Sequence, residues 1–450
     1  MVNESFQWER QPKAEAVVLG AIETCCRQNE FIARLEHFLH ELTSTRLLDW
    51  ADHVILGHSE ELDSELTEAG FISDVASTSY RVFHHPGAQL PRIVVKDHDQ
   101  PVVGLAIAAD SIADFLMVHQ LSTKIEGSLL SGYRRSCVAS DDVSLWVVER
   151  RGTLTMEPTH TDDAHAAKYL HACELWQSRP RDLHNDGEAM NRTIALAQEL
   201  VDMMGQDMAA WIVLECERRY WEARNHAGQV QKDRQDRLGL GWANHDHHTF
   251  RSSRRHFVKL VRVFEILGFH CRERFYAGED AGWGAQVMEN SNCGLVLFLD
   301  VDLDPHEVAV DFAHHELPEL DKLGTIGLWC ELHGDSILKA GMHHLEAQFN
   351  FTDLTEDLAE MGIGMMEPFS NFDYLKQAFT SGEVWAVDER RVRMLQDRGM
   401  ITAEQADKFR HYGAVGSHLE NLQRREGYKG FNKKNVSFII KKTDPRSLEV

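Results

Sequence analysis

The sequence predicts an α+β protein built from repeated βαβββ units with an added helical region. Residues 160–232 keep apolar side chains at helical spacing almost without interruption. Short apolar runs typical of strands, such as RIVVK and GLVLFLDVDL, lie on either side of that segment. The order strand, helix, glycine and strands recurs along the chain, and a recurring order indicates an internally duplicated unit.

The first half of the chain is expected to be an N-terminal region, residues 1–236. Apolar positions at helical spacing predict two helices over residues 14–46. DHVILGH then predicts a strand, and an acidic helix follows that ends at Gly70. The runs RIVVK, VVGLAIAA and VSLWVVERRGTLTM predict further strands. We expect this half to hold a degenerate βαβββ unit followed by the helical segment, with a boundary at the charged stretch QKDRQDRLG.

The second half, residues 237–450, restarts the pattern. HDHHTFRSS predicts a strand, and RRHFVKLVRVFEIL predicts a helix closed by Gly268 as a C-cap residue. Three strand-like runs complete this unit. A second unit begins at GMHHLEAQFNF, continues through the helix DLTEDLAEMG and runs on to GEVWAVDE. Two such units in one chain build a half-open barrel, in which the first strand of each unit and the last strand of one unit meet.

Composition excludes several classes of protein. The 450 residues include 47 basic and 71 acidic side chains, so the net charge of −24 repels phosphate and disfavours nucleic acid as a partner. No apolar run approaches the roughly 18 residues of a membrane helix, and MVNESFQWERQPKAE does not resemble a signal peptide. The eight cysteines form no CxxC pair, which predicts buried thiols in a reducing compartment. We expect a cytoplasmic protein whose oligomeric state the sequence leaves open.

Histidine is the informative residue type, because 26 histidines occur and many are clustered. Alternation along a strand lets each strand direct one ligand inward. His247, or one of its neighbours, lies on the first strand of one unit and His344 on the equivalent strand of the next, while Glu383 lies in the strand SGEVWAV. Two imidazoles and a carboxylate on one side of a metal leave positions open for substrate and oxygen. Spacing alone leaves open that these are buried polar histidines.

The order of units resembles the vicinal oxygen chelate superfamily, and within it the 2-oxoadipate dioxygenase/decarboxylase family, over about residues 243–390. HHTFRSSRRHFVKLVRVFEILGF is similar to the family's first module, in which an Arg that grips a substrate carboxylate follows the metal-binding His. FYAGEDAGW, GMHHLEAQFNF and NFDYLKQAFTSGEVWAVDERR are similar to later stretches of the family. The resemblance implies His247, His344 and Glu383 as metal ligands and Arg251 as the residue that holds the substrate carboxylate.

The chain departs from the family in three places. After His344 the family has a Thr-Pro-Arg run, where this chain has Glu346, Ala347 and Gln348. The family's second acidic residue is Trp385 here. The family's helical insertion lies between its two modules, whereas the long helical stretch here precedes His247. The resemblance therefore bears on the metal ligands more than on the substrate.

Other candidate residues have a structural interpretation. Asp300 and Asp302 alternate on one strand and are alternative ligands to Glu383, but we expect them to end the strand and meet solvent. His53 is a ligand only if the first half forms the metal barrel, and a degenerate copy is the favoured interpretation. The residues expected on a solvated helix face are His160, His165 and His171. Gly334-Asp335-Ser336 resembles a serine-hydrolase block, but the usual Asp-x-x-His partner motif does not follow it. The sequence has no P-loop or GxGxxG element, which disfavours nucleotide and dinucleotide cofactors.

The resemblance implies a mononuclear non-haem oxygenase that holds Fe(II), or another divalent metal. Its partners would be a small 2-oxo or hydroxy carboxylic acid and O2, and its reaction an oxidative decarboxylation. Two alternatives stay open at this point. One is a non-redox metal-dependent isomerase or lyase on the same fold, and the other is a binding protein whose barrels have lost their metal.

Overall fold

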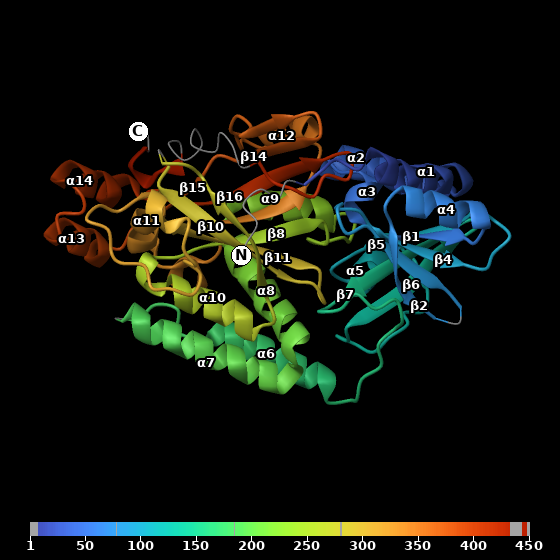
Figure 1. Cartoon of the computed structure of the whole chain (residues 1–450), viewed down its shortest axis with the longest axis horizontal. Coiled ribbons are helices and arrows are strands. Elements are labelled where there is room, and N and C mark those ends of the chain that lie inside the picture. The colour runs from blue at the N-terminus through green and yellow to red at the C-terminus, as the bar shows by residue number, and fades with distance from the viewer. Residues whose placement is uncertain (1–7, 78, 184, 280, 433–442, 448–450) are drawn as a thin grey trace.

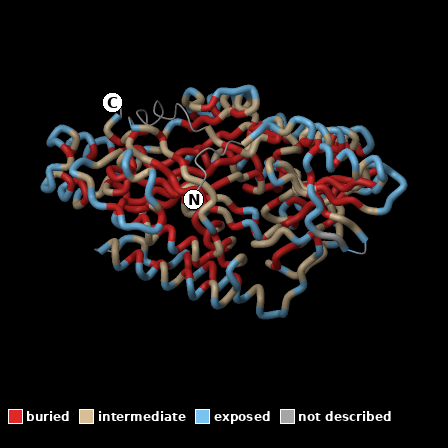
Figure 2. Tube along the Cα trace, viewed as in Figure 1, coloured by how far each residue is buried: buried red, intermediate tan, exposed pale blue. Residues whose placement is uncertain are grey.

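The computed structural model describes residues 8–77, 79–183, 185–279, 281–432 and 443–447. Figure 1 shows two lobes side by side, each built on one sheet, with the N-terminal lobe in blue to cyan and the second lobe in green to red. Figure 2 shows that the strands run through the buried interior, while the outer faces of the helices are exposed. The predicted α+β class is confirmed.

The N-terminal lobe holds a seven-stranded mixed sheet in the order β2-β3-β4-β1-β5-β7-β6. Strand β1 runs parallel to β4 and antiparallel to β5, and β5 runs parallel to β7. The segment β1-α4-β2-β3-β4 is therefore a complete βαβββ unit, and β5-α5-β6-β7 is a second unit with one strand fewer. The strands are β1 Ala51–Gly57, β2 Ile72–Ala76, β3 Arg81–His84, β4 Arg92–Lys96, β5 Val102–Ala108, β6 Tyr133–Ser140 and β7 Ser144–Arg150.

Amphipathic helices cover this sheet on one side. Helices α1 and α2 fulfil the prediction for residues 14–46, and the side chain of Asn29 caps α2 by accepting the N–H groups of Phe31 and Ile32. The helix after β1 ends just before Gly70, as the sequence predicts. The helices of the lobe are α1 Pro12–Gln28, α2 Glu30–Thr43, α3 Leu47–Trp50, α4 Glu60–Glu68 and α5 Ile112–Val118.

The predicted helical region forms four helices, of which α6 and α7 lie below the second lobe in Figure 1 and α9 lies beside β16. They are α6 His165–Ser178, α7 Asp186–Met204, α8 Gln206–Glu222 and α9 His226–Asp236. Buried residues of α6, α7 and α8 belong to the same core cluster as strands β8 and β11 and helix α10. The helical region thus shares its core with the second lobe, although it precedes residue 237 in the sequence.

The second lobe holds a nine-stranded mixed sheet with the main order β13-β14-β16-β12-β8-β11-β10-β9. Strand β8 is parallel to β11, β12 is parallel to β16, and β8 and β12 are antiparallel neighbours. Two βαβββ units, β8-α10-β9-β10-β11 and β12-α12-β13-β14-β16, therefore join through their first strands. This arrangement confirms the two predicted βαβββ units of the second half, which share one open sheet.

The strands of this sheet are β8 His245–Arg251, β9 His270–Tyr276, β10 Trp283–Asn290, β11 Leu295–Asp302, β12 His344–Gln348, β13 Ser370–Phe372, β14 Leu375–Phe379, β15 Glu383–Trp385 and β16 Ala414–Arg424. The α-helices around it are α10 Phe257–Ile266, α11 Thr325–His333, α12 Phe351–Glu360, α13 Glu389–Asp397 and α14 Ala403–Tyr412. Short helical turns cover Arg254–His256, Pro305–Glu307 and Pro445–Ser447, and a π-helical segment covers Ser336–Ala340. Gly268, at φ +84°, follows α10 as predicted, because a left-handed conformation at this position favours glycine.

The end of the second unit differs from the sequence prediction. GEVWAVDE contributes only the three-residue strand β15, which lies off the main path of the sheet and pairs with β16. The strand that closes the unit is β16, which the sequence analysis did not identify. Helices α13 and α14 separate β15 from β16, so the closing strand lies beyond the region of family resemblance.

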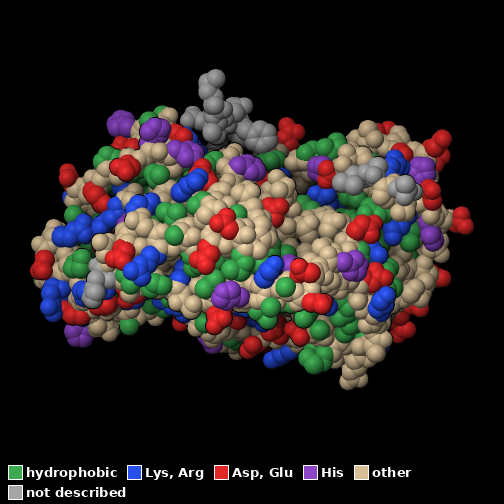
Figure 3. Space-filling view, turned by 90° about the horizontal axis from the view of Figure 1, so that it is seen from below, with side chains coloured by type: hydrophobic (Ala, Val, Ile, Leu, Met, Phe, Trp, Pro, Cys, Tyr) green, Lys and Arg blue, Asp and Glu red, His purple; other side chains and the backbone are tan. Residues whose placement is uncertain are grey.

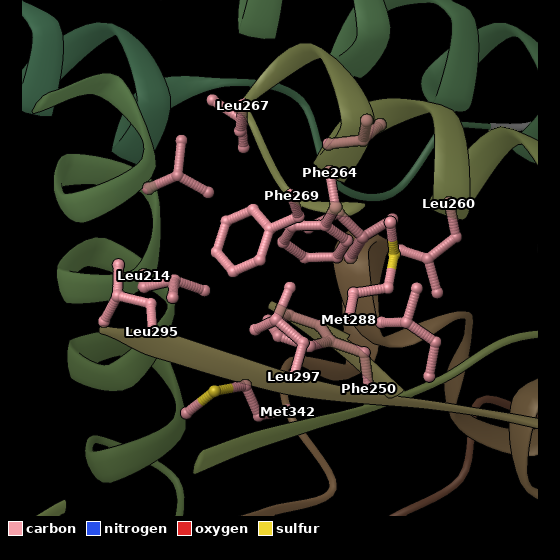
Figure 4. Packing of buried hydrophobic residues seen from close by; sticks show 14 of the residues in the cluster. Leu214, Phe250, Leu260, Phe264, Leu267, Phe269, Met288, Leu295, Leu297 and Met342 are labelled. Atoms are coloured by element: carbon pink, nitrogen blue, oxygen red, sulfur yellow. The ribbon is translucent and has the colours of Figure 1, made fainter. Parts of the chain in front are cut away.

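The largest hydrophobic core lies between the second sheet and the helices beneath it. Figure 4 shows Phe250 and Leu297 from the sheet facing Phe264 of α10, with Leu214 of α8 closing the side. All but Leu214 have no exposed surface, and Leu214 is 2% exposed. Burying a side chain of this size contributes roughly 1.5–3 kcal/mol. This core fixes β8 and β11, whose opposite faces carry polar residues.

The surface agrees with the composition. Figure 3 shows acidic and basic side chains interspersed over one face of the molecule. The eight cysteines are free thiols, and five of them are buried. Within the described part of the chain, none of the helices combines the length and the apolar character needed to span a bilayer.

Candidate metal centre

His247 and His344 lie next to each other on the central strands of the second sheet. Strands β8 and β12 are antiparallel and pair His247 with Glu346 and His344 with Thr249. Register partners and residues two apart share one face of a sheet, so both histidines face the same side as Glu346. Their ring centroids are 6.2 Å apart, and their residues are 2% and 7% exposed. The sequence prediction named both histidines as ligands.

The carboxylate that joins the two histidines belongs to Glu420. The parallel pairing of β12 and β16 makes Glu420 the register partner of Glu346, so Glu420 shares the same face. Its Oε2 lies 2.9 Å from His344 Nε2, while Glu346 Oε2 lies 2.8 Å from His247 Nε2. His247, His344 and Glu420 each offer one potential ligand atom, and these three atoms lie within 4.8 Å of one another.

Glu383, the carboxylate ligand in the sequence prediction, lies outside this group. It begins β15, opposite Ser417 of β16, and is half-buried. Its Oε2 accepts the backbone N–H of His226 at 3.0 Å. The structure therefore brings together His247 and His344 but not Glu383, and Glu420 from the closing strand takes the third position.

Burial and like charge set the electrostatics of the group. Burial, followed by repulsion from Glu420, raises the pKa of Glu346 to about 8. Burial raises the pKa of Glu420 to about 7. Burial and the neighbouring His247 hold the pKa of His344 well below its usual value, so its imidazole is neutral. Two neighbouring buried carboxylates and two imidazoles form a donor set that fits a divalent cation, because the cation would offset the repulsion between the carboxylates.

A pocket with a cavity volume of about 80 Å³ opens beside this group. Arg251 lines it and is 5% exposed. Its Nε and Nη1 atoms are buried without a hydrogen-bond partner, and its guanidinium lies 5.4 Å from the ring centre of Trp329. Burial lowers the pKa of Arg251 to about 10, against the opposing effect of Asp300. Arg251 is thus a buried cation with free N–H donors in the pocket, where the sequence prediction places a carboxylate-binding residue.

Aromatic rings form two walls of the pocket. The ring centroids of Phe298 and Phe431 lie 4.4 Å and 5.3 Å from the ring centroid of His247. Phe379 lies 4.9 Å from the ring of His344, on the other side. These rings place apolar surface next to the polar and charged side chains of the pocket, a combination that occurs in small-molecule sites.

Asp300 and Asp302 do not meet solvent, contrary to the sequence expectation. Asp300 is 4% exposed and lines the pocket beside Arg251, its register partner. Burial raises the pKa of Asp300 to about 7. Asp302 is 1% exposed and accepts the N–H groups of Ile326 and Gly327 at the start of α11. Both carboxylates are buried because α11 and the second unit cover the end of β11.

The remaining candidates have structural roles. His53 is buried in the first sheet against Asp52, with Nδ1 and Oδ1 2.6 Å apart. Asp335 accepts hydrogen bonds from the backbone N–H and the hydroxyl of Ser253, and Ser336 Oγ accepts the backbone N–H of Arg251 at 2.8 Å. His160 and His171 are exposed as expected, while His165 is half-buried and contacts the carbonyl oxygen of Leu130.

Comparison with known proteins gives the following similarities. No protein-family model and no curated protein matches the sequence. A 4-hydroxymandelate synthase variant from Streptomyces coelicolor is 12% identical, with a TM-score of 0.26, over 89% of this chain and 98% of that chain. A methylmalonyl-CoA epimerase from Mycobacterium tuberculosis is 11% identical, with a TM-score of 0.24, over 40% of this chain and 87% of that chain.

A glyoxalase I variant from Zea mays is 9% identical, with a TM-score of 0.19, over 23% of this chain. The match spans 44% of the maize chain, which is less than half of its length. The two βαβββ units of this chain are defined by the strand order and register of its own second sheet.

Proposed function

We propose that this chain is a metal-dependent enzyme, a mononuclear non-haem Fe(II) oxygenase that acts on a small 2-oxo carboxylic acid. The observation that carries the proposal is the position of one unpartnered buried cation, Arg251, in the same pocket as a buried group of two histidines and a carboxylate. Such a pocket presents metal ligands at one point and a carboxylate-binding group at another.

His247, His344 and Glu420 would hold the metal. A ferrous ion bound by two imidazoles and one carboxylate keeps coordination positions open for a 2-oxo acid and for O2. Glu346 lies beside these ligands. Burial and Glu420 raise the pKa of its carboxyl group to about 8, and a bound cation would favour its deprotonated form.

Arg251 would orient the substrate through its distal carboxylate. It is four residues beyond His247 on the same strand face, a separation of roughly 13 Å between Cα atoms at the usual strand rise. Guanidinium binds carboxylate through paired N–H donors, and the Nε and Nη1 donors of Arg251 have no hydrogen-bond partner in the part of the chain that the structure describes. Asp300, its neighbour, has a carboxyl group that exchanges a proton near neutral pH, because burial raises its pKa to about 7.

The aromatic walls would exclude water from the bound substrate. Phe298 and Phe431 cover the His247 side, and Phe379 covers the His344 side. A dry pocket strengthens the interaction between Arg251 and a carboxylate and limits the release of reactive species into solvent.

The experiment is anaerobic loading of the metal-free protein with Fe(II), followed by measurement of O2 consumption and CO2 release. The substrates are 2-oxoglutarate, 2-oxoadipate, 2-oxobutanoate and phenylpyruvate, each with a protein-free control. We expect equal amounts of O2 consumed and CO2 released with at least one acid. Metal binding without O2 consumption would favour the non-redox isomerase or lyase instead, and absence of metal binding would favour a binding protein.

A further inference from the structure

Asp246 makes a contact with His247 that the proposed site does not yet use. Its Oδ1 lies 3.3 Å from His247 Nδ1, while His247 Nε2 faces the carboxylate of Glu346 on the pocket side. A carboxylate accepts hydrogen bonds, so Nδ1 carries the proton and donates it to Asp246. With Nδ1 as the donor, a metal ion that replaces the contact between Nε2 and Glu346 would bind the lone pair of Nε2, the nitrogen that faces the candidate metal centre.

Arg424 anchors Asp246 from the last position of β16. Its Nη2 lies 3.3 Å from Asp246 Oδ1, and its Nη1 donates to the carbonyl oxygens of Tyr428 and Gly430 at 3.1 and 2.7 Å. The side chains of Asp246 and Arg424 are 5% and 6% exposed. An arginine with three fixed partners restricts the position of the carboxylate between it and the imidazole.

The N-terminal lobe contains the same three residue types in the same topological positions. Asp52 is the second residue of β1, as Asp246 is of β8, and Arg150 ends β7, as Arg424 ends β16. Asp52 Oδ1 lies 2.6 Å from His53 Nδ1 and 2.9 Å from Arg150 Nη2. Arg150 also donates to two backbone carbonyl oxygens, those of Thr153 and Thr155.

The two copies differ in what surrounds the histidine. Two groups of potential metal ligands occur among the described residues: His247, His344 and Glu420, and Asp246, His247 and Glu346. His247 belongs to both groups, and His53 belongs to neither. Side chains near His53 on the corresponding sheet face form an apolar cluster that includes Ile55, Val82 and Val94. The chain therefore provides a matched pair: one Asp–His–Arg arrangement beside a candidate metal centre and one without it.

We propose that Asp246, held by Arg424, is a positioning residue that orients His247 so that its Nε2 binds the metal. The inference rests on the proposed metal centre and extends it to a residue outside the ligand set. Carboxylates that accept the second N–H of a ligating histidine fix its tautomer and ring orientation, and their loss typically lowers metal affinity 10- to 100-fold.

The test is titration of the metal-free protein with Co²⁺ by calorimetry and by visible absorption. Variants Asp246→Asn and Asp246→Ala are compared with the matched controls Asp52→Asn and Asp52→Ala. We expect the Asp246 variants to bind Co²⁺ about 10- to 100-fold more weakly and to show shifted d–d bands at saturating metal. The Asp52 variants should keep the wild-type affinity and bands, although both sets lose a buried charged partner and melt at lower temperature.

Three results would overturn the inference. Unchanged Co²⁺ affinity and spectrum in both Asp246 variants would show that the contact does not position His247. An equal loss of affinity in the Asp52 variants would assign the effect to general stability. If the wild-type protein binds no Co²⁺, the proposed function fails together with the inference, which distinguishes that case from the first two.

If the Asp246 variants do not fold, Arg424→Lys replaces them, with Arg150→Lys as its control. Lysine keeps the positive charge beside the carboxylate but cannot reproduce the planar multi-point anchor. We expect weaker Co²⁺ binding in Arg424→Lys only, and equal binding in both lysine variants would contradict the inference.

Discussion

Glu346 and Glu420 are register partners on the parallel strands β12 and β16, so two carboxylates face one buried space beside two histidines. Both residues are nearly inaccessible, at 0% and 2% exposure. Their proximity raises the pKa of Glu346 further than burial alone. Without a cation, the two buried carboxylates repel each other and destabilise the folded state. A bound divalent cation would offset this repulsion, so such a pair is expected at a metal centre.

The first prediction compares Glu420→Gln with Glu383→Gln. Glutamine retains the shape of glutamate but is a weaker ligand, so Glu420→Gln should weaken Co²⁺ binding by more than about 100-fold, the upper range for loss of an outer partner alone. Glu383→Gln should bind Co²⁺ like the wild type, because the Glu383 carboxylate contacts the backbone of His226 instead. Calorimetric titration measures both affinities.

A thermal-shift experiment provides an independent measurement of the same prediction. At a free Co²⁺ concentration 100 times the Kd, binding stabilises the native state by about 2.7 kcal/mol. The wild type and Glu383→Gln should show this stabilisation, and Glu420→Gln should not. If Glu383→Gln loses the stabilisation and Glu420→Gln retains it, the ligand set predicted from the sequence is the correct one.

The sequence analysis identified the strands of both histidines because their pattern is local. HDHHTFRSS and GMHHLEAQFNF each precede an amphipathic helix, so strand, histidine and helix could be placed together. The apolar runs on either side of these two histidine strands then indicate that both strands are buried in the sheet. The βαβββ order of the first unit of the second half was predictable for the same reason, whereas the closing strand of the second unit was not.

Glu420 was not predictable from the same signals. Strand β16 carries buried polar residues at Ser417, His418, Glu420 and Asn421, so the apolar and polar alternation that marks a half-buried strand is absent. The partner strands that bury these side chains are far away in sequence. The sequence analysis named Asp300 and Asp302 as alternative ligands but expected them to meet solvent, because only the tertiary cover by α11 and the second unit buries them.

The second prediction concerns Arg251. Its Nε and Nη1 donors have no hydrogen-bond partner among the described residues, so Arg251→Ala should weaken binding of a substrate carboxylate by about 2–5 kcal/mol, as for loss of one partner of a buried charge pair. Arg251→Lys should lose less, because it keeps the charge without the paired donors. Calorimetry with the substrate acid identified by the oxygen assay measures the affinity, in protein saturated with Co²⁺.

Co²⁺ affinity in the absence of the acid is the control for these variants, and it should stay within about twofold of the wild type, because Arg251 is not a ligand. Arg254→Lys is a matched arginine variant on the same segment. Arg254 pairs with Glu307 and contacts two carbonyl oxygens outside the pocket. Equal acid affinity in Arg251→Ala and the wild type would remove the assigned role of Arg251.

The third prediction concerns stability and pH in the helical region. Glu217 of α8 is fully buried and accepts hydrogen bonds from Trp176, Arg179 and Arg181. Burial raises its pKa, but the two arginines outweigh burial and hold the pKa below the usual 4.5. Glu217→Gln leaves both guanidinium groups without a counter-charge and should cost about 3–5 kcal/mol at pH 7.

The sign of the pH dependence follows from the lowered pKa. A carboxylate whose pKa is depressed in the folded state stabilises that state above its unfolded pKa and loses this contribution as pH falls through the folded value. The difference in free energy of unfolding between wild type and Glu217→Gln should therefore be largest above pH 4.5 and shrink at lower pH. Urea unfolding at pH 7, 5 and 3 measures this difference in free energy.

Glu188→Gln is the control, because the ion pair of Glu188 with Arg192 is more than half exposed on both sides and contributes about 1 kcal/mol or less. A difference for Glu217→Gln that stays constant from pH 7 to pH 3 would show that loss of packing, rather than of the charge pair, destabilises the variant.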